Sequence, residues 1–371
     1  MEQVSNHTAS SEESAVNQSN RYTSEMYETS GDLVNYWYAA GESKEFKKGK
    51  PQARTIFDIP IVFWRKKDGT VSAILDRCNH RNAPLSKGKT IDDCLVCPYH
   101  GWKYAADGQC VDIPSEGPYK ERIPNKKVDA YKVTERYGLI WVWMGRHAPD
   151  KEPFKMPIME EQGWKWYYMR TPFPNNVTDL VENFMDVPHT VYVHEGWFRD
   201  RKQMAVVATV ERTKDSVLVS YDQPNDSIGF SQWIVNPKKL PMKHTDNFYM
   251  PNNTRVDYTY GDQERGFMIS STCTPSKPFE TMVYTLISYK FGWLTPLVGL
   301  GLPFYTRQVI QQDVDIMKLH AENLEKFKFK TEYRSTLCDA MHIYIESLRE
   351  HAIKPKETPP KPITKEVEFW I

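Results

Sequence analysis

Apolar and polar positions change their spacing twice along the chain. Between about residues 35 and 145, short apolar runs such as TIFDIPIVFW, VSAILDRC and YGLIWVWMG are separated by turn sequences such as KDGT. Beyond about residue 164, longer alternating runs follow, among them MAVVATVERT, SVLVSYDQ and TMVYTLISYK. Runs of this kind, bounded by turn residues, are typical of antiparallel strands. The pattern therefore predicts a small β module of hairpins followed by a larger antiparallel sheet.

Helical spacing replaces this pattern from about Pro303 to Glu350. Residues 1–30 are polar and lack apolar periodicity, which predicts a disordered tail. The segment 146–163 is rich in Pro, Glu and Lys and is interpreted as a connection between domains. We therefore expect a tail at 1–30, a β domain at 35–145, a linker at 146–163, a larger mixed domain at 164–350 and a C-terminal tail at 351–371, whose strand-like end docks back.

Composition narrows the classes of partner. The chain has 371 residues, with 48 Lys plus Arg against 48 Asp plus Glu, so no basic excess favours nucleic acid. The N-terminus lacks the basic start and apolar run of a secretory signal, and we expect a cytoplasmic protein. The uncharged stretch 291–306 is too short for a spanning helix. It is interpreted as a buried loop or helix pair covering a pocket, and membrane contact is not expected.

Two Cys/His pairs form the most informative motif. Cys78-x-His80 is followed, after sixteen intervening residues, by Cys97-x-x-His100. These pairs could bind either zinc or an iron–sulfur cluster, but zinc sites commonly place two cysteines within one short segment. Here each short segment, called a clip below, pairs one thiolate with one imidazole. This arrangement suits a [2Fe–2S] cluster held by two Cys on one iron and two His on the other.

A second candidate metal site follows about 90 residues later. His189 and His194 are five residues apart, with Pro188 favouring a break in any helix there. Two imidazoles and one carboxylate form the facial triad that leaves positions open on Fe(II). By itself the histidine pair is a weak signal, and the carboxylate has to come from further along, where Asp313 and Asp315 are both available.

Together these motifs resemble a known family. The two clips and the Gly-Trp after His100 resemble the Rieske motif C-x-H-x(16-18)-C-x-x-H. The stretch from Glu182 to His194 is similar to the mononuclear-iron motif of Rieske non-haem iron oxygenases, and the resemblance covers roughly residues 35–350. It implies an α+β fold, with an all-β Rieske domain and a helix-grip catalytic domain in which an antiparallel sheet wraps around helices.

The resemblance also assigns roles to residues. It implies that the Rieske [2Fe–2S] cluster is held by Cys78, His80, Cys97 and His100, and the mononuclear Fe(II) by His189, His194 and Asp313, with Asp315 as the competitor. Asp186 corresponds to the carboxylate that carries electrons from the cluster of an adjacent subunit, which implies a homotrimer.

The implied activity is that of a terminal oxygenase component. Electrons from the cluster reach Fe(II), which activates O2 to hydroxylate or oxidatively demethylate an apolar or aromatic compound. The compact spacing from Asn183 to Asp186 is closer to the monooxygenase and demethylase branch; ring cis-dihydroxylation is the alternative. A different class would be a non-oxygenating Rieske electron carrier or redox sensor. Gly299-Leu-Gly301 lacks the third glycine of a dinucleotide fingerprint, so NAD(P)H and flavin are expected to act in a separate reductase, through a ferredoxin or directly.

Overall fold

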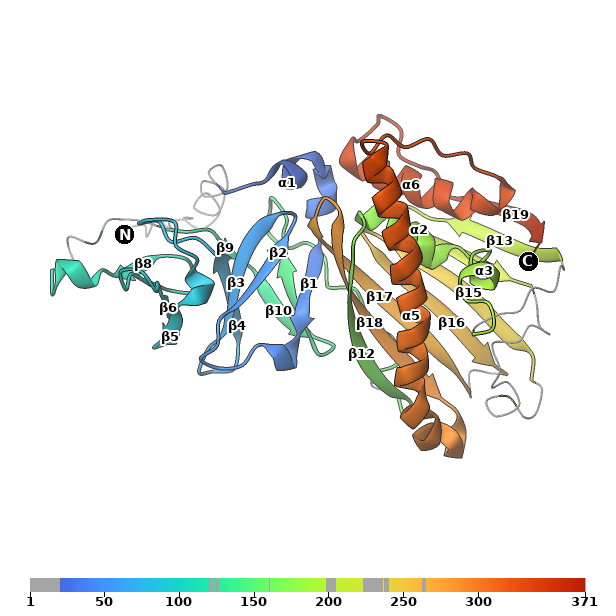
Figure 1. Cartoon of the computed structure of the whole chain (residues 1–371), viewed down its shortest axis with the longest axis horizontal. Helices are drawn as coiled ribbons and strands as arrows, with labels where there is room; N and C mark the ends of the chain where they lie inside the picture. The colour runs from blue at the N-terminus through green and yellow to red at the C-terminus, as the bar shows by residue number, and fades with distance from the viewer. Residues whose placement is uncertain are drawn as a thin grey trace, which may run out of the picture.

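Two bodies lie side by side in the computed structural model, which describes residues 21–119, 123, 127–159, 161–197, 205–222, 236, 240–261 and 265–370. Figure 1 shows a smaller β-rich N-terminal body and a larger one in which helices lie over a wide sheet. This architecture confirms the predicted α+β fold, with its β-rich first domain and its sheet-and-helix second domain.

The prediction of a disordered tail at 1–30 is wrong for residues 25–30. Residues 25–34 form helix α1 (Glu25–Thr29) and the 3-10 turn η1 (Gly31–Val34), whereas residues 1–20 lie outside the described part of the chain. Tyr27 is buried and donates a hydrogen bond to the Met144 carbonyl at 2.8 Å. The few apolar residues of this polar segment are therefore enough to anchor it, which its overall composition concealed.

The N-terminal domain contains three small antiparallel sheets. One has the order β2-β3-β4-β9, one the order β1-β11-β10, and the third the order β5-β6-β7-β8. The strands are β1 (Trp37–Glu42), β2 (Gln52–Ile56), β3 (Ile59–Arg65), β4 (Val71–Leu75), β5 (Lys89–Ile91), β6 (Cys94–Val96), β7 (Lys103–Tyr104), β8 (Cys110–Asp112), β9 (Ala130–Tyr131), β10 (Val133–Arg136) and β11 (Leu139–Trp143). Short 3-10 turns are η2 (Ser43–Glu45), η3 (Leu85–Lys87) and η4 (Pro114–Glu116).

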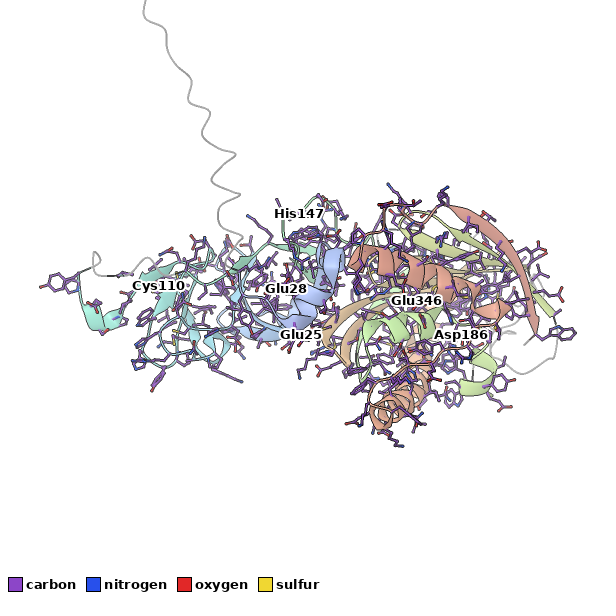
Figure 2. The ribbon with its side chains drawn as sticks, turned by 90° about the horizontal axis from the view of Figure 1, so that it is seen from above. Glu25, Glu28, Cys110, His147, Asp186 and Glu346 are labelled. Carbon is purple, nitrogen blue, oxygen red and sulfur yellow. The ribbon has the colours of Figure 1, made fainter. Side chains whose placement is uncertain are left out.

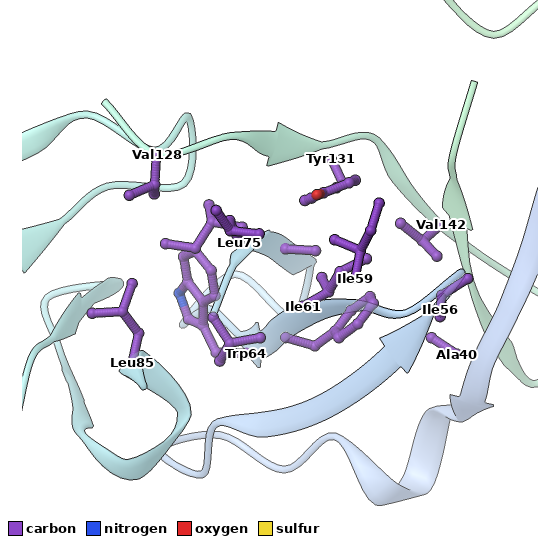
Figure 3. Packing of buried hydrophobic residues seen from close by; sticks show 14 of the residues in the cluster. Ala40, Ile56, Ile59, Ile61, Trp64, Leu75, Leu85, Val128, Tyr131 and Val142 are labelled. Atoms are coloured by element: carbon purple, nitrogen blue, oxygen red, sulfur yellow. The ribbon is translucent and has the colours of Figure 1, made fainter. Parts of the chain in front are cut away.

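One large apolar cluster fills most of this domain, and a second, smaller one packs Ala39, Leu139 and Trp141 against the large sheet of the second domain. Figure 3 shows the Trp64 indole packed between Leu75 and Leu85, with Ile59 and Ile61 further along the same strand. The Trp64 Nε1–H also donates to the Asp93 carbonyl at 2.8 Å. This bond joins the loop between β5 and β6 to the sheet β2-β3-β4-β9. It therefore fixes the position of the sheet β5-β6-β7-β8, which carries the second Cys/His clip.

The C-terminal domain is built on one eight-stranded antiparallel sheet of order β12-β18-β17-β16-β15-β14-β13-β19. Its strands are β12 (Lys165–Phe173), β13 (Ala205–Arg212), β14 (Ser216–Tyr221), β15 (Met242–Tyr249), β16 (Asn253–Tyr260), β17 (Arg265–Lys277), β18 (Glu280–Lys290) and β19 (Ile363–Trp370). In β19, Val367 and Phe369 point inward and alternate with exposed residues, and the strand pairs with β13 along its length. The segment predicted to dock back therefore forms the edge strand of the sheet beside β13.

Helices cover one face of this sheet. They are α2 (Val177–Met185), α3 (Thr190–Val193), α5 (Thr295–Lys326) and α6 (Ala340–Ile353), with the 3-10 turns η6 (Gly292–Leu294) and η7 (Leu337–Asp339). The helical region begins at Thr295, earlier than the periodicity predicted. Pro296 stands at the start of α5, where a missing N–H has no intrahelical partner to lose, and Pro303 is accommodated within the helix.

The two domains are joined through β17 and the helix α6. Backbone N–H groups of Phe57 and Asp58 donate to the carbonyls of Pro275 and Ser276 at 2.8 and 2.7 Å. Gly31 packs against the end of α6 with a φ of +54°, and a Cβ there would lie 2.3 Å from the Ile353 carbonyl oxygen. A larger residue would push the N-terminal domain off the helix.

Candidate functional site

The first Cys/His clip lies in the tight turn that follows β4. The Cys78 N–H donates to the Ala83 carbonyl, and the Asn82 N–H donates to the Cys78 carbonyl, both at 2.9 Å. The Tyr104 hydroxyl lies 3.2 Å from the Cys78 sulfur and accepts a bond from the Asn79 N–H at 3.1 Å. The backbone therefore holds the thiol in a fixed, buried position.

The second clip forms an equivalent turn after β6. The Cys97 N–H donates to the Trp102 carbonyl at 2.8 Å, and the turn closes at Gly101, whose φ of +74° favours glycine. The two loops face each other: the His80 and His100 ring centroids are 4.5 Å apart, and His80 stacks on Trp102 at 4.8 Å. All four predicted ligand residues are thus brought to one end of the domain.

These residues fit a [2Fe–2S] cluster. Cys78 and Cys97 are both free and buried, and burial, reinforced by the neighbouring Cys78 thiol, raises the pKa of Cys97. The His80 Nδ1 is a buried polar atom with no hydrogen-bond partner among the described residues. A bound metal would satisfy this nitrogen and hold both sulfurs as thiolates. Two thiols facing two imidazoles are the donor set of a Rieske cluster.

The second site is formed where α2 ends. Asp186 caps the C-terminus of α2, Pro188 follows, and His189 and His194 are the residues immediately before and after the single turn of α3. The break expected at Pro188 is present, and it places the two imidazoles with centroids 5.2 Å apart. From the middle of α5, the Asp313 Oδ1 lies 3.5 Å from the His189 Nε2 and 3.2 Å from the His194 Nε2.

Three ligand atoms therefore point at one place. The candidate ligand atoms of His189, His194 and Asp313 all lie within 4.8 Å of one another. Asp313 is only 6% exposed, and its Oδ1 has no well-oriented hydrogen bond among the described residues. By contrast, Asp315 is exposed and accepts a bond from the Gln311 amide at 2.8 Å. Of the two candidate carboxylates, only Asp313 is brought to the histidines.

The charges around this site favour a cation. Burial acts to lower the pKa of His189, but interactions with Asp186 and Asp313 outweigh it and raise that pKa to about 9. Burial likewise acts to raise the pKa of Asp313, and its contacts with the two histidines reverse the effect and lower it. A divalent metal would replace the protons that these groups otherwise share. The donor set of two imidazoles and one carboxylate fits non-haem Fe(II).

Two further side chains orient the histidines. The Nδ1 of His194 and the Gln312 Oε1 are 2.9 Å apart, an arrangement in which a protonated Nδ1 donates and Nε2 keeps its lone pair toward Asp313. The Asp186 Oδ2 accepts the His189 backbone N–H at 3.2 Å and lies 3.4 Å from its Nδ1. No sequence pattern points to Gln312 as a partner of His194, because nothing local to it signals contact with a residue 118 positions away.

A cavity of about 460 Å³ opens beside these residues, between the sheet and helices α2, α3 and α5. Its walls are mostly apolar, and they include Asp186, His189, His194 and Asp313. Leu297, Leu302 and Tyr305 of α5 form part of the wall, so the stretch 291–306 does cover a pocket. The expected buried loop or helix pair is wrong, because the stretch forms η6 and the start of one helix, and most of its side chains are not buried. Trp293 of η6 and Leu300 and Phe304 of α5 are exposed on this segment. Within the described ranges, no helix has the length and apolarity needed to cross a membrane.

The two candidate metal sites lie in different halves of the chain. In Figure 2, Cys110, which belongs to the small sheet beside the Cys/His clips, lies in the N-terminal half, whereas Asp186 lies among the helices of the other half. In Figure 1, β5, β6 and β8 lie at the far end of the molecule from α2, α3 and α5. Large parts of both domains separate the two sites within one chain.

The fold and the two sites define a two-domain protein of the Rieske oxygenase class. Residues 36–132 match the Rieske [2Fe-2S] domain, and residues 176–354 match the vanillate O-demethylase oxygenase C-terminal domain. Taken together, the two matches cover most of the chain in the order of the two sites. The chain belongs to the Rieske non-haem iron oxygenase family, on the branch whose catalytic domain is of the vanillate O-demethylase type.

Individual relatives agree with this assignment. The chain is 37% identical to the oxygenase component of dicamba O-demethylase from Stenotrophomonas maltophilia over 163 residues, which are 43% of this chain and 47% of that protein. It is 27% identical to the protein TIC 55 of Pisum sativum over 316 residues, 81% of this chain and 54% of that one. The chain thus spans about half the length of these curated relatives.

A solved structure shows the same fold. The crystal structure of dicamba monooxygenase bound to 3,6-dichlorosalicylic acid superposes with a TM-score of 0.75 at 22% identity, covering 87% of this chain and 98% of that chain. The superposition therefore extends over both domains.

Proposed function

We propose that this chain is a terminal oxygenase component. It takes up electrons at a Rieske cluster, passes them to a mononuclear Fe(II), and uses O2 to hydroxylate or oxidatively demethylate an apolar or aromatic small molecule. The observation that carries the proposal is the convergence of His189, His194 and Asp313 at the wall of a largely apolar cavity, in a chain that also has a Rieske domain.

Each residue then has a defined task. Cys78 and Cys97 would hold one iron of the cluster, and His80 and His100 the other. His189, His194 and Asp313 would hold the Fe(II), which, when bound, supplies open coordination positions at which O2 is activated. Gln312 keeps His194 in the tautomer that is protonated at Nδ1, because the Gln312 Oε1 accepts a hydrogen bond from that nitrogen. The apolar walls hold the substrate body and keep bulk water away from the reacting centre.

The separation of the two sites within one chain supports electron transfer between subunits, and the family resemblance makes that assembly a homotrimer. Electrons have to reach the Fe(II) from a cluster that is near it, whereas the small sheet next to the cluster-binding residues of the same chain lies at the other end of the molecule from α2, α3 and α5. Asp186 is the residue proposed to link the two centres between subunits, since it contacts His189 and lines the cavity. NAD(P)H and flavin would act in a separate reductase, which passes electrons to this chain through a ferredoxin or directly.

Monooxygenation is preferred over cis-dihydroxylation. The matched catalytic domain is named for an O-demethylase, and the names of relatives include dicamba O-demethylase and 3-ketosteroid-9-alpha-monooxygenase. A pure electron carrier is not favoured, because it would have no use for a buried triad of potential ligands beside a cavity.

Metal analysis tests the proposal directly. Protein purified without oxygen should contain about three irons and about two acid-labile sulfides per chain, and the reduced cluster should give a Rieske electron paramagnetic resonance signal. His189→Ala and Asp313→Asn should each lose about one iron while the cluster signal persists. Asp315→Asn is the matched control and should keep all of its iron. About two irons in every variant would exclude the mononuclear site, and zinc without sulfide would exclude the cluster.

Asp186→Asn tests the link between subunits. The Asn side chain can still accept the His189 N–H, so iron content should be unchanged. The cluster, reduced beforehand, should be reoxidised by O2 and substrate at least about tenfold more slowly in a single turnover. Gel filtration of the same protein should give a trimer, and a monomer with full activity would rule out electron transfer between subunits.

A further inference from the structure

The sheet side of the cavity carries one charged residue where its neighbours are apolar. Along one row of directly paired residues, β14, β15, β16, β17 and β18 contribute Val219, Asp246, Val256, Ile269 and Ile287. Asp246, Val256, Ile269 and Ile287 of this row line the cavity. Among the described lining residues, the other carboxylates are Asp186 and Asp313, which lie on the helix side beside the histidines.

Asp246 is held rigidly in this position. It is 2% exposed, and the His244 Nε2 lies 2.9 Å from its Oδ1 while the Tyr221 hydroxyl donates to its Oδ2, also at 2.9 Å. His244 is stacked between the rings of Tyr221 and Tyr258 on the adjacent strands, at centroid distances of 4.3 and 4.4 Å. These contacts therefore fix the orientation of the Asp246 carboxylate without any help from a ligand.

This carboxylate keeps acceptor capacity on the cavity side. A carboxylate offers about four lone-pair positions, and the two contacts above use one on each oxygen. Of the pair, Asp246 lines the cavity and His244 does not. The other polar side chains on the sheet wall are mainly hydroxyls, and two of them, Ser271 and Thr285, bond to each other at 3.0 Å. The strongest acceptor presented to a ligand by the sheet is Asp246.

We propose that Asp246 recognises the polar end of the substrate, and that the cavity selects compounds with an apolar body and a hydrogen-bond donor over compounds carrying a carboxylate or sulfonate. The donor is a hydroxyl, an N–H or an ammonium group. A buried acceptor left without its donor is penalised, so a ligand lacking the donor binds more weakly. An anionic ligand meets like charge in a poorly solvated site and is rejected more strongly. The inference rests on the proposed role of this cavity as the substrate site.

Three matched probes test the selection. 2-Naphthol has the donor, 2-methoxynaphthalene lacks it, and 2-naphthoate carries a carboxylate; the common two-ring body suits a cavity of this size. Their dissociation constants are measured by calorimetry on the full-length oxidised protein, with no reductant, so that no turnover occurs. We expect the wild type to bind 2-naphthol at least about tenfold more tightly than either of the other two probes.

Asp246→Asn and a matched control identify the residue. Asn keeps the shape and removes the charge, so the variant should bind 2-naphthoate about tenfold more tightly than the wild type does, and its preference for 2-naphthol should shrink. Asp257→Asn removes a carboxylate from the neighbouring strand β16, at a residue outside the cavity lining that bonds to Arg255, and should behave as wild type. Circular dichroism and the melting temperature report whether each variant is folded.

Several results would overturn the inference. One is a wild type that binds 2-naphthoate as tightly as 2-naphthol, a comparison that needs no variant to fold. Another is an Asp246→Asn variant with unchanged preferences and a lower melting temperature, because Asp246 would then only brace the sheet. Absence of binding by all three probes would also reject it. Iron analysis of the same preparation keeps the proposed function separate: loss of the mononuclear iron with intact probe selection would refute the oxygenase and support the recognition by Asp246.

Discussion

Replacing Gln312 by methionine should weaken iron binding without unfolding the site. Methionine has nearly the same length and volume as glutamine but no amide oxygen, so His194 loses the acceptor that lies 2.9 Å from its Nδ1. His194 is 3% exposed, so bulk water cannot readily replace that acceptor. The imidazole should then sample orientations and tautomers in which Nε2 no longer points at Asp313.

The magnitude follows from two independent estimates. A buried neutral hydrogen bond contributes about 1 kcal/mol, and leaving its partner unsatisfied costs about 1–3 kcal/mol. Loss of a residue that orients a metal-binding histidine typically lowers metal affinity about 10–100-fold, or about 1.4–2.7 kcal/mol. We therefore expect the dissociation constant for Fe(II) to rise about 10–100-fold in Gln312→Met.

A chelator competition under anaerobic conditions measures this constant, with the Rieske signal as an internal check that the cluster is intact. Gln311→Met is the control, because Gln311 is the adjacent residue, is exposed and bonds only to Asp315 in the contacts described for it. Gln312→Glu should keep or increase affinity, since a carboxylate accepts the Nδ1–H more strongly. An Fe(II) constant for Gln312→Met within about twofold of wild type would refute the reasoning.

Three further predictions concern the cluster, the core and pH. Cys97→Ser should abolish the Rieske signal and the labile sulfide. The control Cys110→Ser should retain both, because the Cys110 thiol contacts the Asp112 carbonyl at 3.7 Å and lies outside the two clips. Loss of the signal in both variants would contradict the ligand assignment. Arg349→Met should lower the free energy of unfolding, measured in urea titrations, by about 3–5 kcal/mol. The buried Arg349 guanidinium donates to the Pro251 carbonyl at 2.6 Å, to Asn252 and to Thr178, and the variant would leave these buried acceptors without a donor. A loss under about 1 kcal/mol would contradict this reasoning. Glu182→Gln should raise stability at high pH, because desolvation, helped by Asp179 and Glu346, raises the pKa of Glu182 to about 7 from an ordinary value of 4.5. The free energy of unfolding of the wild type therefore falls by about 3 kcal/mol as pH rises from about 4.5 through 7, and the variant should be more stable by that amount at about pH 8 and equal at about pH 4. Equal melting temperatures at about pH 8 would contradict the assigned pKa.

Motif spacing within short segments was informative because the chemistry is local there. The turns around Cys78 and Cys97 are closed by backbone hydrogen bonds within a few residues, so sequence spacing alone indicated paired clips. The break at Pro188 was predictable for the same reason. Composition was a poorer guide, as the packed segment 25–34 shows, because its few buried residues, Tyr27, Leu33 and Val34, anchor it but contribute little to an average.

Contacts between distant segments could not be read from the pattern. Asp313 and Asp315 are equally acidic and both lie on one helix, but they are two residues apart and so face different directions on α5. Only the packing of that helix over the sheet turns Asp313 toward the histidines and Asp315 toward solvent. The contact of Gln312 with His194 and the position of Asp246 in the cavity wall depend in the same way on how α5 and β15 are placed.

The sequence by itself determined the class of this protein: two domains in order, two metal-binding motifs, and the residue types that each metal prefers. These properties depend on covalent spacing and on the coordination chemistry of Cys, His and Asp, which the sequence states directly. Only the tertiary structure decided which carboxylate lies beside the two histidines, which side chains contact each histidine and what the cavity presents to a ligand. Those properties depend on the relative placement of elements more than 100 residues apart, and that placement is set by packing of the whole core rather than by any local pattern.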